Sequence, residues 1–183
     1  MFHRTRRLFL RPAFPEDWQA LYAGIADHGV VRNLARAPWP YTKDDARAWA
    51  ARAQDDRLPA FIVTAPTGDG ERLVGSAGLG LAEDGQVQCG YWIARPFWGR
   101  GYATEALSGV IEVARTLGHE RVVGAHFLDN PASGRVLEKA GFAPTGRITS
   151  CYSCGRGEEA PLREYAIDLR GGATCGGPQP VAA

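Results

Sequence analysis

A short segment with two glycines, Trp98-Gly-Arg-Gly-Tyr-Ala-Thr-Glu-Ala106, has the residue types of a phosphate-binding turn. A strand-like run, Val87–Ile93, precedes it and an amphipathic helix follows it, so Gly99 and Gly101 fall where the chain turns from one into the other. Glycine lets the backbone approach a ligand closely and adopt positive φ. A helix N-terminus adds unpaired N–H groups and a partial positive charge. The spacing therefore predicts a site for the phosphate groups of a cofactor.

A second segment with polar residues in a defined pattern runs from Asp129 to Phe142. Asn130 is a typical N-cap, and the proline that follows it favours the first position of a helix. Ser133 falls in the first turn, and Gly141 ends the helix with Phe142 as the hydrophobic partner of the cap. The segment predicts a short helix that presents Asn130 and Ser133 at its N-terminal end, where both also have a purely structural explanation as cap and first-turn residues.

The elements that position these two segments follow from hydrophobic periodicity and from turn residues. Seven strands are predicted, at about 8–12, 60–65, 72–79, 86–93, 121–127, 145–152 and 162–169. Four helices are predicted, at about 15–28, 42–55, 102–117 and 131–140. This order gives a fold of the α/β (α+β) class with a mixed, mostly antiparallel sheet. Because a helix joins the fourth and fifth strands, these two are expected to be parallel and to splay apart, and ligands favour such a junction.

The length and composition indicate one soluble domain, which we place at residues 1–170, with a disordered tail at 171–183 that is rich in Gly, Pro and Ala. The formal net charge of +1 argues against a nucleic-acid partner, and no apolar run is long enough to cross a membrane. Without a secretory signal, the expected location is cytoplasmic. Cys151 and Cys154 form a single Cys-x-x-Cys pair, so we expect free thiols and no metal site.

Taken together, the two segments resemble the GNAT N-acetyltransferase superfamily, in the form found in the branch of ribosomal-protein N-terminal alanine acetyltransferases, over about Leu8 to Leu169. The resemblance implies an enzyme that transfers the acetyl group of acetyl-CoA directly to a primary amine, either a protein N-terminus or a small molecule. It would act as a monomer or a homodimer. The alternative is a non-catalytic domain that binds acyl-CoA as a sensor or scaffold.

The resemblance also implies which residues hold the cofactor. Backbone amides of the loop would bind the coenzyme A pyrophosphate, and the loop residues concerned are Trp98, Gly99, Arg100, Gly101, Tyr102, Ala103 and Thr104. The fourth strand would pair with the pantetheine arm through Trp92, Ile93 and Ala94, and an N–H near Ile93 would polarise the thioester carbonyl. Asn130 would hydrogen-bond the pantetheine, and Ser133 would lie near the sulfur. Arg95 and Arg100 either meet the 3′-phosphate or are solvated.

For catalysis, Ser133 is the candidate acid, because Leu137 stands where many members of the family carry a tyrosine. Gln88 stands where many carry a glutamate as base, and glutamine cannot take a proton. The base is therefore open between Glu83, Asp84, His126 and ordered water. Cys89 is disfavoured as a covalent nucleophile unless it points into the groove.

The candidate residues for binding the amine acceptor are aromatic residues and two glutamates. Trp39 and Tyr41 either line the acceptor pocket or pack against the first helix. Tyr91 and Trp92 alternate across a strand, so at least one is expected in the core, and Tyr91 is our candidate substrate contact. The carboxylates of Glu158 and Glu159 either attract an amine or are solvated.

Overall fold

The computed structural model describes residues 1–68 and 70–170. The expected tail at 171–183, with Cys175, lies outside the described residues, as does Asp69 in the turn between the second and third predicted strands. The strands are β1 (His3–Arg4), β2 (Phe9–Arg11), β3 (Ala60–Thr67), β4 (Gly70–Leu81), β5 (Val87–Ile93), β6 (Arg121–Phe127), β7 (Ala143–Ser153) and β8 (Glu158–Asp168). The α-helices are α1 (Trp18–Ile25), α2 (His28–Val31), α3 (Lys43–Ala50), α4 (Tyr102–Thr116) and α5 (Pro131–Lys139).

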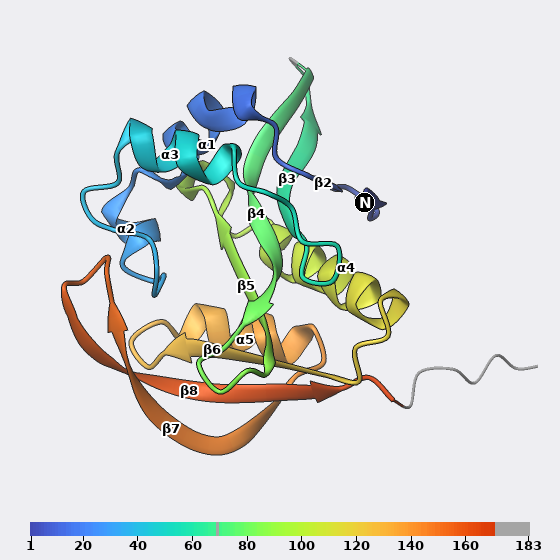
Figure 1. The fold of residues 1–183 in the computed structure, drawn as a ribbon, viewed down its shortest axis with the longest axis vertical. Helices are drawn as coiled ribbons and strands as arrows, with labels where there is room; N and C mark the ends of the chain where they lie inside the picture. The colour runs from blue at the N-terminus through green and yellow to red at the C-terminus, as the bar shows by residue number, and fades with distance from the viewer. Residues whose placement is uncertain (69, 171–183) are drawn as a thin grey trace, which may run out of the picture.

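The described strands form one eight-stranded sheet in the order β1-β2-β3-β4-β5-β6-β8-β7. Its neighbours are antiparallel except β5 and β6, which are parallel and are paired only at Gln88 and Val123 within the described residues. Figure 1 shows β3, β4 and β5 running upright and β6, β8 and β7 crossing below them, so that β5 and β6 diverge. The predicted mixed sheet with its parallel, splayed junction is confirmed.

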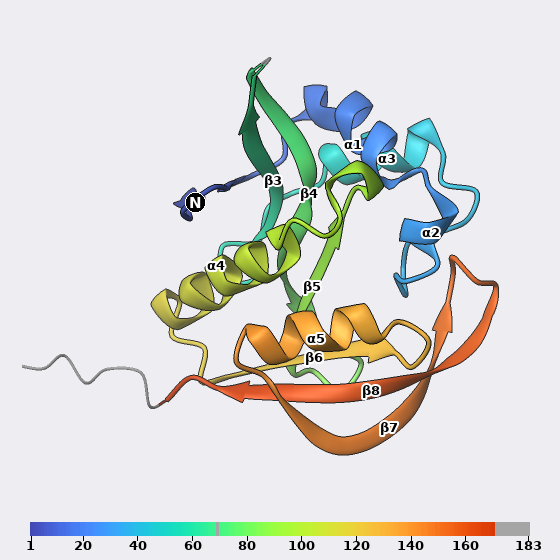
Figure 2. The same cartoon turned by 180° about the vertical axis from the view of Figure 1, so that it is seen from behind.

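Helices cover both faces of the sheet, as the two opposite views show (Figures 1 and 2). One core lies under α4 and α5, and the other lies under the helices of the N-terminal third. The alternation of β3 supplies both cores: Phe61 and Val63 belong to the first and Ile62 to the second.

Two helices end earlier than the sequence predicts. The helix expected over 15–28 breaks after Ile25, because the Asp27 carboxylate accepts the N–H of Gly29 at 2.7 Å and caps a separate short helix, α2. The helix expected to reach residue 55 ends at Ala50. The side chain of Asp55 instead accepts hydrogen bonds from the backbone amides of Arg57 and Leu58. The break after Ile25 gives five α-helices in place of four, and the pairing of β1 with β2 gives an eighth strand that the sequence analysis missed.

Candidate functional site

Two pockets meet where β5 and β6 separate. The first, of about 540 Å³, lies between α2, the end of β5, the start of α4 and α5. The second, of about 550 Å³, lies between the loop after α2, α3, β4, β5 and β6. Five residues line both pockets: Asn33, Leu34, Tyr91, Trp92 and Ser133. Two ligands in these pockets would therefore meet beside Tyr91 and Ser133.

The glycine loop borders the first pocket in the conformation that its sequence predicts. Gly99 and Gly101 have φ of 73° and 76°, which other residues rarely adopt. Helix α4 starts at Tyr102, and its first backbone bond runs from the amide of Glu105 to the carbonyl of Gly101. The amides of residues 102–104 precede that bond and have no partner within the helix. Together with the positive end of the α4 dipole, they suit an anion.

Two cations of α5 also line the first pocket, and the sequence analysis missed both. Arg135 and Lys139 lie on the same face of α5 as Ala132 and Val136, at the i, i+3, i+4, i+7 spacing that marks one side of a helix. This spacing in the sequence could have identified Arg135 and Lys139 as residues that face the same side as Ala132 and Val136. Arg95 and Arg100, for which contact with the 3′-phosphate and solvation were both left open, do not line this pocket: Arg95 pairs with Asp27 at 3.4 Å, and Arg100 stacks over Phe97 at 5.5 Å.

At the end of β5, backbone N–H and carbonyl groups face the gap between β5 and β6. The amide of Ala94 donates to Val74 of β4 at 2.8 Å, so by the alternation of an antiparallel ladder Ile93 turns its N–H and carbonyl to the opposite side, toward β6. The carbonyl of Ile93 accepts the indole N–H of Trp98 at 2.6 Å. Of the three residues expected to pair with pantetheine, Ile93 thus has its N–H toward the gap, whereas Ala94 uses its N–H within the sheet.

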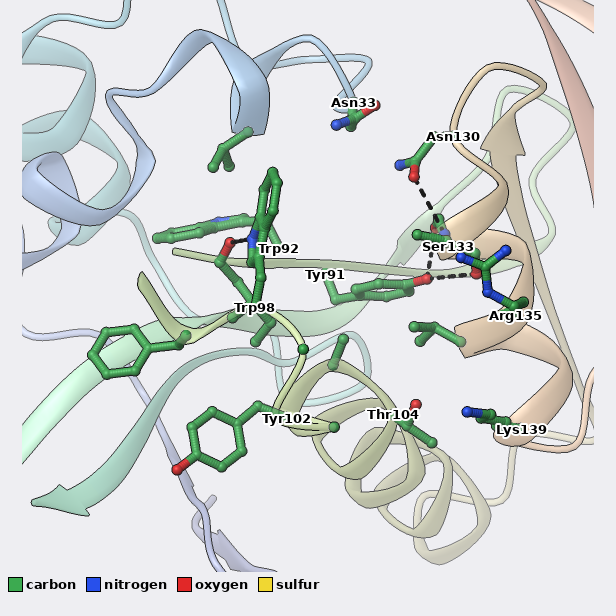
Figure 3. A pocket seen from close by; sticks show the side chains of 18 of the residues that line it. Asn33, Tyr91, Trp92, Trp98, Tyr102, Thr104, Asn130, Ser133, Arg135 and Lys139 are labelled. Carbon is green, nitrogen blue, oxygen red and sulfur yellow. Dashed lines mark hydrogen bonds between the residues drawn. The ribbon is translucent and has the colours of Figure 1, made fainter. Parts of the chain in front are cut away.

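Tyr91 reaches across from β5 to α5. Figure 3 shows its ring pointing at Ser133, and the two hydroxyl oxygens are 2.7 Å apart. The Tyr91 hydroxyl also lies 3.1 Å from the carbonyl oxygen of Ser133, to which it donates. Burial raises the pKa of Tyr91 well above its usual value, so the phenol is protonated. Its neighbour Trp92 is the buried member of the pair, as the alternation predicts.

The start of α5 places the two polar residues of its motif together. Asn130 lines the first pocket, and its side-chain oxygen caps the helix by accepting the amide of Ser133 at 3.3 Å. Leu137, where the family often has a tyrosine, is 1% exposed and lies in the core. The hydroxyl nearest to Ser133 therefore comes from the neighbouring strand rather than from the next turn of the helix.

His126 of β6 is buried and lines the second pocket. Its Nδ1 lies 2.8 Å from the carbonyl oxygen of Phe127. Because a carbonyl only accepts, Nδ1 is the donor in this contact, and in that tautomer the lone pair lies on Nε2. A Cβ on Gly134 would lie 2.7 Å from this Nε2, so the absence of a side chain there lets the imidazole pack against α5 next to Ser133.

The other residues considered as bases lie in different surroundings. Gln88 lines the second pocket, at the single paired position between β5 and β6. Asp84 accepts the side-chain amide of Gln86 at 2.6 Å, and neither Asp84 nor Glu83 lines either pocket.

The loop before α3 forms a wall of the second pocket. Tyr41 is buried in that wall, and burial together with the nearby Asp45 raises its pKa to about 12. Trp39 instead lies outside both pockets and packs against His28, with ring centroids 5.1 Å apart. Glu158 and Glu159 also lie outside the pockets.

The cysteines of the described chain are free thiols. Cys89 does border the second pocket, but burial raises its pKa to about 12, so it is protonated and a poor nucleophile. Residues 1–68 and 70–170 contain no cluster of His, Cys, Asp and Glu able to hold a metal ion. No helix in these ranges combines the length and apolar character that a membrane crossing requires.

Solved structures share this fold over nearly the whole chain. The match to a GNAT-family acetyltransferase from Bacillus anthracis has a TM-score of 0.77 at 23% identity and covers 92% of this chain and 99% of that one. The match to the microcin C7 self-immunity acetyltransferase MccE, in complex with acetyl-CoA and AMP, has a TM-score of 0.74 at 17% identity and covers 89% of this chain and 93% of that one. The match to RimL, a ribosomal L7/L12 α-N-protein acetyltransferase in complex with coenzyme A, has a TM-score of 0.73 at 18% identity and covers 92% of this chain and 98% of that one. The ribosomal branch that the sequence resembles is thus one of several neighbours with similar scores.

Sequence comparisons extend the likeness from fold to family. The chain is 26% identical over 159 residues to the uncharacterized N-acetyltransferase YnaD of Bacillus subtilis (strain 168), which covers 82% of this chain and 88% of YnaD. The sequence model of the acetyltransferase (GNAT) domain matches residues 7–143. Enzymes of this family use acetyl-CoA. The chain belongs to the GNAT acetyltransferase family.

Proposed function

We propose that this enzyme transfers an acetyl group directly from acetyl-CoA in the first pocket to a primary amine in the second. The observation that carries the proposal is the meeting of the two pockets at Tyr91 and Ser133, in the gap between β5 and β6. Direct transfer requires both substrates to be bound at once with their reacting ends adjacent, and two pockets with a shared wall supply that proximity.

The residues of the first pocket fit coenzyme A. Its pyrophosphate suits the amides of residues 102–104 behind the glycine turn, and the cationic side chains of Arg135 and Lys139 add positive charge along the same pocket. Asn130 and the N–H of Ile93 are polar groups that suit the amides of the pantetheine arm. When bound, acetyl-CoA supplies an acetyl group activated as a thioester.

Two groups of this chain suit the charge that develops during acyl transfer. The N–H of Ile93 faces the gap and is fixed by the sheet, so it can donate to an oxygen that becomes negative without further reorganisation. The Ser133 hydroxyl can give its proton to the leaving thiolate; the Tyr91 hydroxyl, 2.7 Å away, then turns from the Ser133 carbonyl and protonates the serine oxygen, and water returns a proton to Tyr91. We therefore assign the acid role to the Tyr91–Ser133 pair rather than to Ser133 alone.

The amine must lose a proton to react. We assign its removal to His126, because the hydrogen bond at Nδ1 leaves Nε2 as the acceptor and the ring lines the second pocket beside Ser133. Gln88 lines the same pocket and is able to orient the amine or a water molecule by hydrogen bonding, but not to act as the base.

One observation favours a second function, a non-catalytic acyl-CoA sensor. Strand β5 carries Gln88 where a catalytic carboxylate is common in the family. The two functions differ in turnover. The purified protein is incubated with acetyl-CoA and a panel of primary amines that includes ribosomal-protein N-terminal peptides, and free thiol and acetylated product are measured.

An acetyltransferase releases thiol and acetylated amine in equal amounts, with intersecting double-reciprocal plots because both substrates are bound before transfer. Parallel plots would contradict direct transfer. Tight binding of acetyl-CoA with no turnover on any amine would favour the sensor.

A further inference from the structure

The second pocket contains an arginine that no residue in the described part of the chain neutralises. Arg52 follows α3 and lines the pocket, with its guanidinium carbon 3.8 Å from the centre of the Trp49 ring. Its Nη2 is buried and makes no hydrogen bond. Over the ranges 1–68 and 70–170, Arg52 has neither a hydrogen bond nor an ion pair.

This is unusual beside the other partly buried arginines of the chain. Arg11 is held by Asp17 at 2.7 Å, and Arg156 is held by Asp129 at 2.8 Å. A guanidinium stays charged when it is buried, so leaving it without a counter-charge has a free-energy cost. Burial lowers the pKa of Arg52, and the neighbouring Tyr41 is a protonated phenol that brings no negative charge.

The remaining charged residues of the pocket do not compensate. Asp45 is the one carboxylate among the described lining residues, and it already accepts hydrogen bonds from the amide and the hydroxyl of Thr42, at 2.8 and 2.6 Å. Arg36, a second lining arginine, donates to the carbonyl of Leu81 at 2.7 Å. The pocket thus has two guanidinium groups and a single, occupied carboxylate, which favours an anionic group on the ligand.

The turn between β7 and β8 lies beside α2 in both views (Figures 1 and 2) and is bonded to the loop that lines the pocket. The Ser153 hydroxyl donates to the carbonyl of Leu34 at 2.9 Å, and the amide of Cys154 donates to the carbonyl of Ala35 at 2.8 Å. Leu34 and Ala35 line the second pocket, so these bonds hold its wall in place. A wall tied down in this way favours a small acceptor over an extended polypeptide.

We propose that the acceptor is a small primary amine that also carries a carboxylate or phosphate, and that Arg52 binds this anionic group while the amine lies near Ser133. This inference rests on the proposed function. The planar guanidinium presents a fork of N–H donors that matches two oxygens of either anion. Its stacking on Trp49 orients the fork, and Tyr41 lines the pocket beside it.

The test compares three series of acceptors: unbranched amino carboxylates of increasing chain length, aminoalkyl phosphates of the same lengths, and alkylamines without an anionic group. Each is assayed with the wild-type enzyme, with Arg52→Met, which keeps an unbranched stem but removes the guanidinium, and with Arg52→Lys. Arg57→Met is the matched control, because Arg57 is exposed and lies outside the pocket but its loss changes the net charge equally.

The wild-type enzyme is expected to prefer one anionic series, and Arg52→Met is expected to lower kcat/KM for it by roughly 10- to 100-fold, which corresponds to the loss of hydrogen bonds to a charged group. Arg52→Lys should recover part of the loss, and Arg57→Met should have no effect. The series with the larger dependence on Arg52 identifies the anion as carboxylate or phosphate.

Equal kinetics of Arg52→Met and Arg57→Met would overturn the inference, and so would turnover of peptide N-termini alone at a rate independent of Arg52. Calorimetry distinguishes failure of the inference about Arg52 from failure of the proposed function. If no amine is acetylated, binding of alkyl carboxylates and alkyl phosphates to the protein loaded with coenzyme A still tests the site, since Arg52→Met should weaken it and unchanged binding would refute it. Unaltered affinity of the variants for coenzyme A shows that they are folded.

Discussion

Replacing Gly101 by alanine tests the glycine turn in a way that separates strain from ligand binding. Gly101 has a φ of 76° at the start of α4, and a Cβ there would meet only the end of the Arg7 side chain, at 3.4 Å. The substitution therefore adds little steric conflict. Its cost is the left-handed backbone conformation, about 1–2 kcal/mol for a residue with a Cβ.

The turn has two ways to respond. It either keeps its conformation, with a loss of stability of about 1–2 kcal/mol, or relaxes and moves the amides that follow it; we expect it to relax, because relaxation relieves this strain. Loss of one hydrogen bond between an amide and a charged phosphate is worth about 1.5–3 kcal/mol, or roughly 10- to 100-fold in affinity. We therefore expect Gly101→Ala to bind coenzyme A at least about tenfold more weakly, as measured by isothermal titration calorimetry.

Gly85 provides the matched control. It has a φ of 79° in the turn before β5, has no atom within 4 Å of its ideal Cβ, and lies outside both pockets. Gly85→Ala should lose similar stability in urea denaturation while binding coenzyme A with wild-type affinity. The reasoning is refuted if Gly101→Ala binds as tightly as the wild type, or if both variants lose affinity equally.

Three further predictions concern the catalytic groups and one ion pair. Ser133→Ala and Tyr91→Phe should each lower kcat by about 10²-fold with little effect on coenzyme A binding, and the double variant should be no slower than the slower single variant, because the two hydroxyls act as one unit. His126→Asn keeps a donor in the place of Nδ1 but has no lone pair in the place of Nε2, so kcat should fall by about 10²-fold or more while coenzyme A affinity is retained. Asp17→Asn should reduce the free energy of unfolding at neutral pH by about 1–3 kcal/mol, because Asp17 is hydrogen-bonded to Arg11. Partial burial of Asp17 opposes its ionisation, but the hydrogen bonds from Arg11 and from a backbone amide outweigh it and hold the pKa below its usual value. A carboxyl whose pKa is lowered by folding stabilises the fold above its unfolded pKa of about 4 and loses that contribution as the pH falls through the folded value, so the difference between wild type and Asp17→Asn should shrink in acid denaturation below about pH 4.

Each of these has a contrary outcome. Additive losses for the two hydroxyl variants would mean that they act independently. An unchanged kcat for His126→Asn would remove that residue as the base. A stability difference for Asp17→Asn that is the same at pH 3 and pH 7 (about one unit below and three above the usual carboxyl pKa) would show that charge plays no part in the pair.

Much of the fold is predictable because its signals are local. Asn130 and Gly141 bound α5 by capping, Thr42 is the N-cap of α3, and the helix between β5 and β6 makes those strands parallel. The two glycines of the turn have the positive φ that their position requires.

What the sequence could not reveal depends on contacts between distant segments. The Tyr91–Ser133 hydrogen bond joins residues 42 positions apart, and the bond from Ser153 to Leu34 spans 119. Arg52 is one of many arginines in the sequence, and what distinguishes it is that it has no hydrogen-bond or ion-pair partner among the residues that the structure describes. The break after Ile25 is a competition between helix continuation and the cap at Asp27, which periodicity alone cannot resolve.

The central claim is that coenzyme A occupies the first pocket with its thiol end at the place where the two pockets meet. A crystal structure of the protein with coenzyme A tests this most directly. We predict that the pyrophosphate lies on the amides of residues 102–104 and that the sulfur lies beside Ser133 and Tyr91. Coenzyme A bound elsewhere, or with its pantetheine arm directed away from the gap between β5 and β6, would contradict the account.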